Sequence, residues 1–221
     1  MKIINIIVAL LPWPIKRWIL VQFYLYNLHP KSYIGLSYIF PKNLIMEEGS
    51  QIGHLNLAIH LEKMLLKRGA RIGRGNWITG FPIKSSTKHF AHQKDRVPEL
   101  LLGEESAITK NHHIDCTNRI SIGAFTTIAG YQSQFLTHSI NIEKGIQDSY
   151  PINIGNYCFI GTNVVVLGGA NLPSYAVLGA KSLLNNHFET EYRLYGGVPA
   201  KEIKSISNSA QYFKRTTGFV S

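Results

Sequence analysis

Residues 154–184 of the chain read IGNYCFIGTNVVVLGGANLPSYAVLGAKSLL, and an aliphatic side chain recurs at every sixth position of this stretch without a break. The repeated positions are Ile154, Ile160, Val166, Leu172, Leu178 and Leu184. A period of six matches neither the 3.6-residue repeat of an α-helix nor the two-residue alternation of an ordinary strand. It fits a coil of three short strands, each with one side chain pointing inward and a corner after it.

The same pattern extends toward the N-terminus. An aliphatic residue followed by glycine marks each turn, at Ile34, Ile52, Ile72, Leu102, Ile122, Ile154, Ile160 and Leu178. From 34 to 52 the marks are 18 residues apart, and from 52 to 72 and from 102 to 122 they are 20 apart. The longer gaps, 30 from 72 to 102 and 32 from 122 to 154, predict two extruded loops, near 79–98 and 130–150.

Stacked coils of this kind pair their strands in parallel at about 4.8 Å and bury one continuous core. The corners need backbone conformations that glycine and asparagine tolerate, and both residues are abundant. The pattern therefore predicts an all-β solenoid over 34–184. An apolar or helical cap is expected over 1–33, and a short C-terminal tail or helix over 185–221.

The composition agrees with one globular domain. The chain has 221 residues, of which 45% are hydrophobic and 16% charged. Its net charge of +10 favours an anionic partner such as a phosphorylated cofactor or a membrane surface. The basic residues are scattered and form no nucleic-acid motif, so no nucleic-acid partner is expected. The two cysteines, Cys116 and Cys158, form no CxxC pair and indicate buried residues in a reducing compartment.

The N-terminus allows two interpretations. The apolar run at residues 3–11 is followed by Pro12 and Pro14, and it is too short to span a bilayer. Apolar residues then recur at helical spacing, with Lys16 and Arg17 on the opposite side. Residues 1–28 are therefore expected to cap the open end of the solenoid, to lie on a membrane surface, or both.

Three motifs carry a family resemblance: the hexapeptide repeats at 154–163, the Leu-Gly-Ala-Lys-Ser segment at 178–182, and Gly-Gly-Val-Pro-Ala-Lys at 196–201. Together they resemble the hexapeptide-repeat acyltransferase family, above all the galactoside and maltose O-acetyltransferases and the sugar O-acetyltransferases of polysaccharide synthesis. The resemblance covers about 34–204. It implies a left-handed parallel β-helix, whereas the general preference for right-handed crossovers would predict the opposite hand.

By this resemblance, the chain is expected to be a cytoplasmic enzyme that uses acetyl-CoA to acetylate a sugar hydroxyl, in surface-polysaccharide, lipopolysaccharide or lipid-linked glycan synthesis. The resemblance also implies a homotrimer with active sites between subunits, and no metal. An amino-sugar acceptor stays open as an alternative. A zinc hydrolase of the gamma-carbonic-anhydrase kind would need a second His four residues after His138, but the nearest candidate ligand, Glu143, stands five after it. A non-catalytic scaffold is the third alternative.

Acyl transfer to a hydroxyl needs a base, and a neutral histidine suits this role near pH 7. The family carries its catalytic His on the extruded loop before the regular coils, so the resemblance assigns that role to His138. Ser139 follows it, where the family often has proline. A carboxylate should hold the other ring nitrogen, and the sequence leaves three candidates: Asp115, Glu143 and Asp148.

The period adds a second group of candidates. If both loops leave the prism at the same corner, after Ile78 and Ile128, the equivalent position between them follows Ile108. We therefore expect a binding site for the acceptor or the oxyanion near His138, with the candidates Asn111, His112, His113 and Asp115. The first loop also contains His89 and His92, which are expected to be solvated or to contact another subunit.

The donor is expected along the C-terminal coils. The resemblance places the pantetheine arm of acetyl-CoA beside small residues, Gly161, Thr162, Gly179 and Ala180. It also places Asn185 at a position where the family often has threonine, followed by Asn186 in place of a lysine. Candidates for contacts with the CoA phosphates are Lys181, Lys201 and Lys204.

Overall fold

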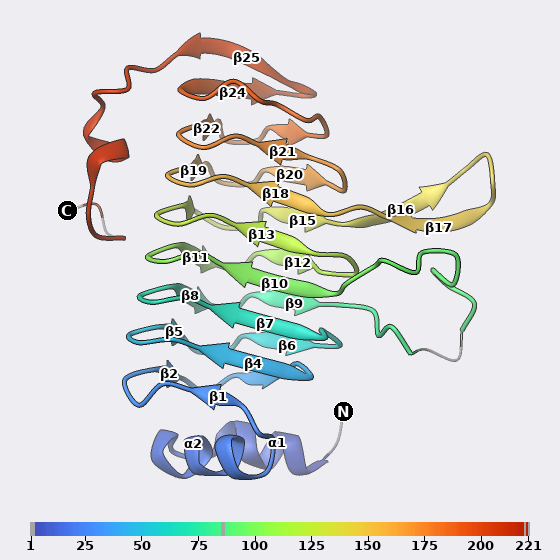
Figure 1. Cartoon of the computed structure of the whole chain (residues 1–221), viewed down its shortest axis with the longest axis vertical. Coiled ribbons are helices and arrows are strands. Elements are labelled where there is room, and N and C mark those ends of the chain that lie inside the picture. Colours follow the sequence, from blue (N-terminus) through green and yellow to red (C-terminus); the bar gives the residue numbers. More distant parts are fainter. Residues whose placement is uncertain (1–2, 85–86, 219, 221) are drawn as a thin grey trace.

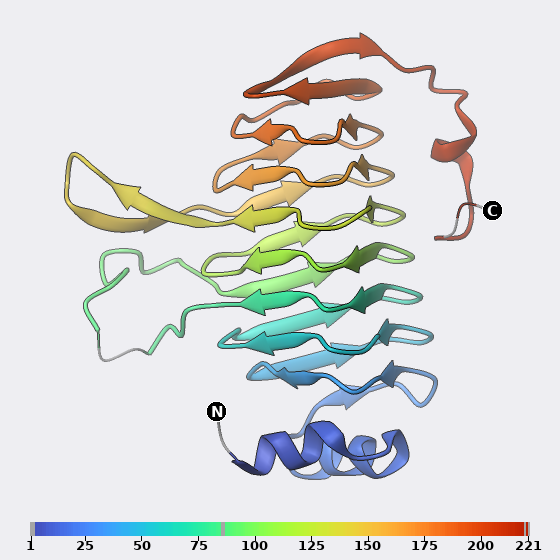
Figure 2. The same cartoon turned by 180° about the vertical axis from the view of Figure 1, so that it is seen from behind.

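The computed structural model describes residues 3–84, 87–218 and 220, and its strands wind around a three-sided prism that is seen from two sides in Figures 1 and 2. The first face consists of β1 (Asn27–Leu28), β4 (Asn43–Met46), β7 (Lys63–Leu66), β10 (Glu99–Leu102), β13 (Ile120–Ile122), β18 (Ile152–Ile154) and β21 (Asn171–Leu172). The second consists of β2 (Tyr33–Ile34), β5 (Gln51–Ile52), β8 (Arg71–Arg74), β11 (Ala107–Lys110), β14 (Thr127–Ile128), β19 (Phe159–Ile160), β22 (Val177–Leu178), β24 (Arg193–Gly197) and β25 (Ala200–Ser205). The third consists of β3 (Tyr38–Phe40), β6 (Leu57–Ile59), β9 (Trp77–Thr79), β12 (His113–Asp115), β15 (Gln134–Leu136), β20 (Val165–Leu167) and β23 (Leu183–Leu184).

The predicted all-β solenoid is confirmed, because within each face consecutive strands belong to consecutive coils and pair in parallel, up to the antiparallel β24 and β25. Aliphatic side chains stack directly above one another. On the third face, Ile114 pairs with Ile78 below and Phe135 above, and all three side chains are fully buried. The core is thus a column of stacked apolar layers, and its stability comes from contacts between neighbouring coils.

The coils of 20 residues have a longer strand on the first face. There, β10 points two side chains inward, Leu100 and Leu102, and β13 does the same with Ile120 and Ile122. Two residues added to a strand keep the alternation of inward and outward side chains, so the register is preserved.

Glycine is not the main residue of the left-handed corners, contrary to expectation, and it is required for another reason. A Cβ on Gly53 would lie 2.3 Å from the carbonyl oxygen of Gly73, so glycine is required there because adjacent coils approach closely. Many left-handed corners are instead occupied by larger residues. Phe125, Tyr157, Tyr175 and Tyr192 all have φ of about +55° to +58°, and their rings form a stack with centroids 4.8–5.3 Å apart.

Both ends of the column are covered (Figure 1). Helices α1 (Ile3–Leu10) and α2 (Trp13–Gln22) lie across the first coil, and the solenoid already begins at β1, earlier than residue 34. At the other end, β24 and β25 close the last coil, and the tail then runs back along the prism through the 3₁₀ turn η1 (Gln211–Lys214). Neither α1 nor α2, nor any other helix in the described ranges, has the length and apolarity needed to cross a bilayer.

Two segments leave the prism, and both leave after a strand of the third face. The first, residues 80–98, follows β9. The second is the hairpin of β16 (His138–Asn141) and β17 (Ile146–Ser149), which follows β15. The expected start of the second loop near 130 is therefore too early: β15 stays in the prism because Phe135 continues the buried column.

Candidate active site

His138 is the first residue of the hairpin and lies where the chain turns out of the prism after β15. Strand β12 lies between β9 and β15, so its end is placed between the two extruded segments. Because the hairpin starts one strand later than expected, the residues beside His138 come from the end of β12 rather than from the corner before it. Asp115 is that end residue, and its strand partner is Leu136.

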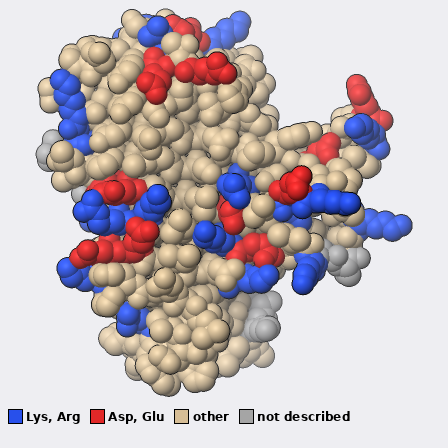
Figure 3. All heavy atoms as spheres, viewed as in Figure 1, with Lys and Arg blue, Asp and Glu red and all other residues tan. Residues whose placement is uncertain are grey.

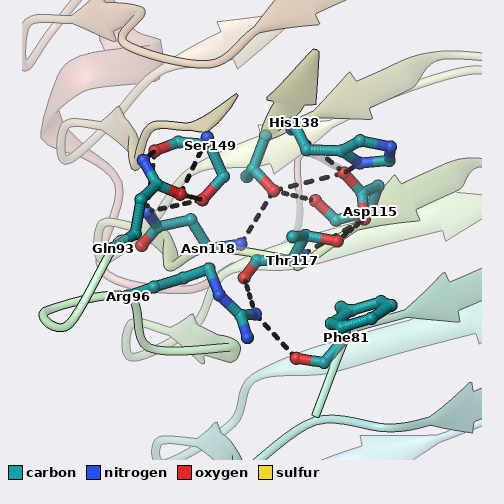
Figure 4. Close-up of polar contacts among 9 residues, drawn as sticks. Phe81, Gln93, Arg96, Asp115, Thr117, Asn118, His138 and Ser149 are labelled. Atoms are coloured by element: carbon teal, nitrogen blue, oxygen red, sulfur yellow. Dashed lines mark hydrogen bonds and ion pairs between the residues drawn. The ribbon is translucent and has the colours of Figure 1, made fainter. Parts of the chain in front are cut away.

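Asp115 and His138 form a directly hydrogen-bonded pair (Figure 4). The His138 Nδ1 atom donates to Asp115 Oδ2 across 2.7 Å, and the backbone N–H of His138 donates to the same oxygen across 3.2 Å. The carboxylate side chain is only 6% exposed, whereas the imidazole is 43% exposed. The bond at Nδ1 selects the tautomer whose Nε2 is free to accept a proton.

Thr117 and Thr137 complete the surroundings of this carboxylate. Asp115 Oδ1 accepts hydrogen bonds from the hydroxyl and the backbone N–H of Thr117, at 2.7 and 3.1 Å. The Thr137 hydroxyl donates to the Asp115 backbone carbonyl at 2.8 Å and lies 3.2 Å from Oδ2. Burial alone would raise the pKa of Asp115, but the hydrogen bonds from His138 and Thr117 outweigh it and keep that pKa below its ordinary value. The carboxylate is therefore ionised at neutral pH.

The pKa of His138 is raised above its ordinary value of 6.5, mainly by the hydrogen bond to Asp115, while partial burial works in the opposite direction. A stronger base results, although a larger fraction of it is protonated at pH 7. Proton uptake at Nε2 is favoured because the imidazolium that forms lies against a fixed negative charge.

The first extruded segment packs against the same histidine. The Phe90 ring, 4% exposed, meets the His138 ring edge-on at a centroid distance of 6.0 Å. Beneath it, the Arg96 guanidinium lies 4.9 Å from the Phe90 ring centroid and donates to the carbonyl oxygens of Phe81 and Thr117, at 2.7 and 2.8 Å. Arg96 thus ties the segment to the turn that follows Asp115 (Figure 4).

Gln93 joins the first segment to the hairpin. Its Oε1 accepts from the backbone N–H and the hydroxyl of Ser149, at 3.0 and 2.7 Å, and its Nε2 donates to the Ser149 carbonyl at 2.9 Å. A second link joins His92 Nε2 to Asp148 Oδ1 at 2.6 Å. His92, expected to be solvated or between subunits, therefore has a partner within its own chain.

The structure separates the three candidate carboxylates. Asp148 accepts from His92 and Asn141, and these hydrogen bonds hold its pKa below the ordinary value. Glu143 lies exposed in the turn of the hairpin. Asp115 alone of the three contacts His138. The described residues contain no group of three or more His, Cys, Asp and Glu side chains placed to hold a metal ion.

The tract at 111–113 precedes β12 and enters it. His112 is buried: its Nε2 pairs with the Thr109 hydroxyl at 3.0 Å, and its Nδ1 accepts from the backbone N–H of Ser133 at 3.2 Å. Burial lowers the pKa of His112 to about 4, so this side chain is neutral and structural at pH 7. Asn111, a left-handed corner with φ +53°, and His113, which pairs with Gln134, are exposed.

The expected donor residues lie at the other end of the third face. Gly161 and Thr162 follow β19, and Gly179, Ala180 and Lys181 follow β22, at the corner that leads into β20 and β23. Thr162 is held by Tyr131, whose backbone N–H and carbonyl both bond its hydroxyl at 3.1 Å. His138 lies beyond the opposite end of β15. Asn185 and the lysines of β25, Lys201 and Lys204, are exposed.

Sequence reasoning missed Phe90, Gln93, Arg96 and Thr117. The first three lie on a segment outside the six-residue period, so no spacing relates them to His138. A weak signal was present for Thr117, because threonine two residues after an aspartate often bonds back to its carboxylate.

Comparison with known proteins supports the same fold. No protein-family model and no curated protein sequence matches the chain. Among solved structures, the polysialic acid O-acetyltransferase OatWY superposes with a TM-score of 0.61 at 17% identity, covering 85% of this chain and 90% of its own. A hexapeptide-repeat acetyltransferase from Vibrio cholerae matches at 27% identity with a TM-score of 0.46, covering 49% of this chain and 63% of its own.

The likeness to OatWY shows the class of fold, a left-handed parallel β-helix. The expected hand of the helix is thereby confirmed. The polySia-specific acetyltransferase NeuO is a further structural neighbour, at 17% identity and a TM-score of 0.47, with 84% of each chain covered.

Proposed function

We propose that this chain is an acetyltransferase that moves an acetyl group from acetyl-CoA to a sugar hydroxyl. The observation that carries the proposal is the pair of His138 and Asp115. The buried, ionised carboxylate of Asp115 holds Nδ1 of the imidazole, and Nε2 stays free and accessible. The fold supports the choice of donor and acceptor only as an analogy.

In the proposed reaction, His138 Nε2 takes the proton of the acceptor hydroxyl as its oxygen attacks the thioester carbonyl. A tetrahedral oxyanion forms, and its collapse breaks the carbon–sulfur bond. The imidazolium then gives its proton to the departing CoA thiolate, which restores the neutral base. Asp115 stays ionised throughout and orients the ring.

The acceptor and the oxyanion need further contacts. Asn111 and His113 lie exposed at the start of β12, at the same end of the third face as the donor corner. We retain both as candidates for binding the acceptor or the oxyanion at a His138 that a neighbouring copy supplies. His112 has both ring nitrogens occupied, and its proposed role is indirect: it holds the Ser133 corner that precedes β15.

A homotrimer is part of the proposal. The donor candidates, including Thr162 and Lys181, lie at one end of the third face, and His138 lies at the other end. A site built from one chain would have to span the full length of β15, whereas a neighbouring copy can bring its donor corner to this histidine. Lys201, Lys204 and Asn185 would then contact the phosphates or adenine end of CoA.

The proposed acceptor is a saccharide of a surface polysaccharide or lipopolysaccharide, or its nucleotide-linked or lipid-linked precursor. OatWY, the neighbour with the same fold, acts by its name on polysialic acid, itself a polysaccharide. Because acetyl-CoA is a cytoplasmic metabolite, the proposed site of action is the cytoplasm. The free, buried Cys116 and Cys158 are compatible with a reducing compartment.

Peripheral contact with the membrane through residues 1–28 is also proposed, because the helical cap exposes large apolar side chains while the two cations of α2 bond to the coils. Lys16 is buried, with its Nζ donating to the Gly35 carbonyl at 2.8 Å, and Arg17 donates to the Leu28 carbonyl. Trp18 and Phe23 are instead 57% and 70% exposed. A surface that holds its cations against the protein and presents aromatic and aliphatic side chains outward is suited to an apolar environment outside the protein.

The direct test is a screen of sugar, amino-sugar and nucleotide-sugar acceptors with acetyl-CoA, in which release of the CoA thiol is followed. The proposal predicts acceptor-dependent thiol release and an acetyl ester in the product. Acetylation of amines alone would replace the O-acetyl assignment. If CoA does not bind and no acceptor reacts, acyl transfer itself is contradicted.

A further inference from the structure

An apolar groove of about 1000 Å³ opens between the helical cap and the lower coils of the third face. The helices contribute Ile7, Trp18 and Phe23, and the third face contributes Phe40 and Ile59. Helix α1 packs against β3, so the groove runs between this helix and the outward side of the sheet. Its size and lining are those of a site for an apolar ligand.

The upper end of the groove reaches toward the catalytic pair. Ile59 pairs with Thr79, and Thr79 pairs with Asp115, so two strand steps, about 10 Å, separate the groove from the base of the site. Gly80 bridges the same interval, since a Cβ on it would lie 2.6 Å from the His60 carbonyl oxygen and 3.2 Å from that of Cys116. The groove and His138 therefore share one face of the solenoid.

The charge distribution indicates which kind of ligand fits. No Lys, Arg, Asp or Glu is among the residues that line the groove, and its polar groups come from Asn5, His60 and tyrosines. In Figure 3, acidic and basic side chains lie over the middle and the upper end of the solenoid, and the end that carries the helices is nearly free of them in this view. A phosphorylated or peptide partner would find no charged anchor there.

From this geometry we infer that the groove binds the hydrocarbon chain of an amphiphilic saccharide acceptor, so that the sugar head is presented to His138 while the chain runs down toward the helical cap. This inference rests on the proposed acyl transfer and narrows its acceptor to the lipid-linked class. Burial of each methylene in such a groove strengthens binding about fourfold, which favours long chains.

The test uses dodecyl maltoside below its critical micelle concentration as the probe and methyl maltoside as the chain-free control, with binding measured by titration calorimetry. The full-length protein should bind the dodecyl probe saturably, one per chain, and should bind the methyl probe at least about tenfold more weakly. Ile59→Lys should weaken dodecyl binding about tenfold or more, because it places an ammonium group in the groove. Ile7→Lys, on α1, should do the same from the opposite wall.

Leu55→Lys is the matched control. This leucine is 77% exposed and lies outside the groove, so the same change should leave probe binding intact. Melting curves identify any variant that has lost its fold. Ile59 points outward beside the buried Ala58, so the core layer is kept.

Three results would overturn the inference. The first is unchanged probe binding in both groove variants. The second is binding to phospholipid vesicles but not to the monomeric probe, which would make the groove a bilayer contact. The third is that the probe displaces a second copy of the chain from the groove, which would be seen as a fall in the molecular mass of the assembly. If the probe binds as expected but no saccharide is ever acetylated, the groove stands and the proposed acyl transfer fails. If the protein acetylates soluble sugars but does not bind the probe, the proposed acyl transfer stands and the inference about the groove fails.

Discussion

Asp115 determines both the orientation and the basicity of His138. Its carboxylate is buried, receives two hydrogen bonds from Thr117, and holds Nδ1 of the imidazole. Together these contacts fix the orientation and the tautomer of the imidazole, which a histidine on the free surface would not have fixed. The consequence is a base that is ready before either substrate arrives.

Asp115→Asn should lower kcat/KM by roughly 10²- to 10⁴-fold, because the amide no longer selects the tautomer with a free Nε2. The dependence of the rate on pH gives a second test of the same contact. In the native enzyme the rate should rise with pH through a His138 pKa above 6.5, since only the neutral ring accepts a proton. Removal of the carboxylate should move this acidic limb to lower pH.

Asp148→Asn is the matched control, because it neutralises a carboxylate that contacts His92 rather than His138. Its acidic limb should stay in place. If both variants shift the acidic limb of the pH profile equally, the shift comes from the change in net charge and not from the contact between Asp115 and His138.

The sequence alone predicts His138 as the base, because the order of motifs places it on the loop before the regular coils. It could not choose Asp115 over Asp148 or Glu143. That choice depends on where the second extrusion begins, which a side chain buried in the column, Phe135, decides. The buried role of His112 was likewise hidden, since His112 and His113 differ only in the direction of their side chains.

At the scale of elements, the two extruded segments act as one unit. Neither contributes to the apolar column, and both depend on polar contacts with each other and with the turn after β12. The period of six predicts the start of the first segment but places that of the second one strand too early. It gives no information on the internal contacts of either segment, which explains why Gln93 and Arg96 were not predicted. The coils themselves were predictable because every turn repeats the same packing requirement.

Gln93→Ala should loosen the hairpin without unfolding the solenoid. It removes three hydrogen bonds to Ser149, worth about 1–3 kcal/mol together after solvent compensation. Local opening should then accelerate trypsin cleavage after Lys144, in the turn of the hairpin, about 5-fold or more. Gln51→Ala, an exposed glutamine of β5, is the control. Equal cleavage rates in the two variants would contradict the role of Gln93 in holding the hairpin.

Helix α2 provides a prediction on stability. Burial lowers the pKa of Lys16 to about 8 from 10.5. Between these values the unfolded state keeps a proton that the folded state has lost, so the free energy of unfolding contributed by this group rises with pH. Relative to Lys16→Met, the native protein should gain about 1–3 kcal/mol between pH 7.5 and pH 10. Urea unfolding at both pH values checks this, and an unchanged difference between the two proteins would show that Lys16 is solvated.

On the scale of the whole molecule, the chain is polarised along its axis. The helical cap exposes Ile3, Leu10 and Leu25 at one end, by 66–84%. The proposed catalytic pair and the proposed donor corner lie in the middle and upper coils. If the cap rests on a bilayer, the column stands upright and holds His138 above the surface.

A double variant, Ile3→Glu with Leu10→Glu, should abolish co-sedimentation with phosphatidylcholine–phosphatidylglycerol vesicles, because both residues would carry charge into the interface. Neither lines the groove, so probe binding there should persist. Leu36→Glu with Leu55→Glu places the same charges on exposed leucines of the coils and should leave co-sedimentation intact. Loss in both double variants would indicate simple electrostatic repulsion from anionic lipid.

The measurement that tests the account most directly is the turnover of His138→Ala with acetyl-CoA and an accepted sugar, together with its affinity for CoA. We expect turnover to fall by about 100-fold or more, because the variant lacks the imidazole proposed to take the hydroxyl proton. CoA affinity should stay nearly unchanged, since the base acts on the acceptor. A variant that keeps a tenth of the native turnover would contradict the assignment of His138 as the base.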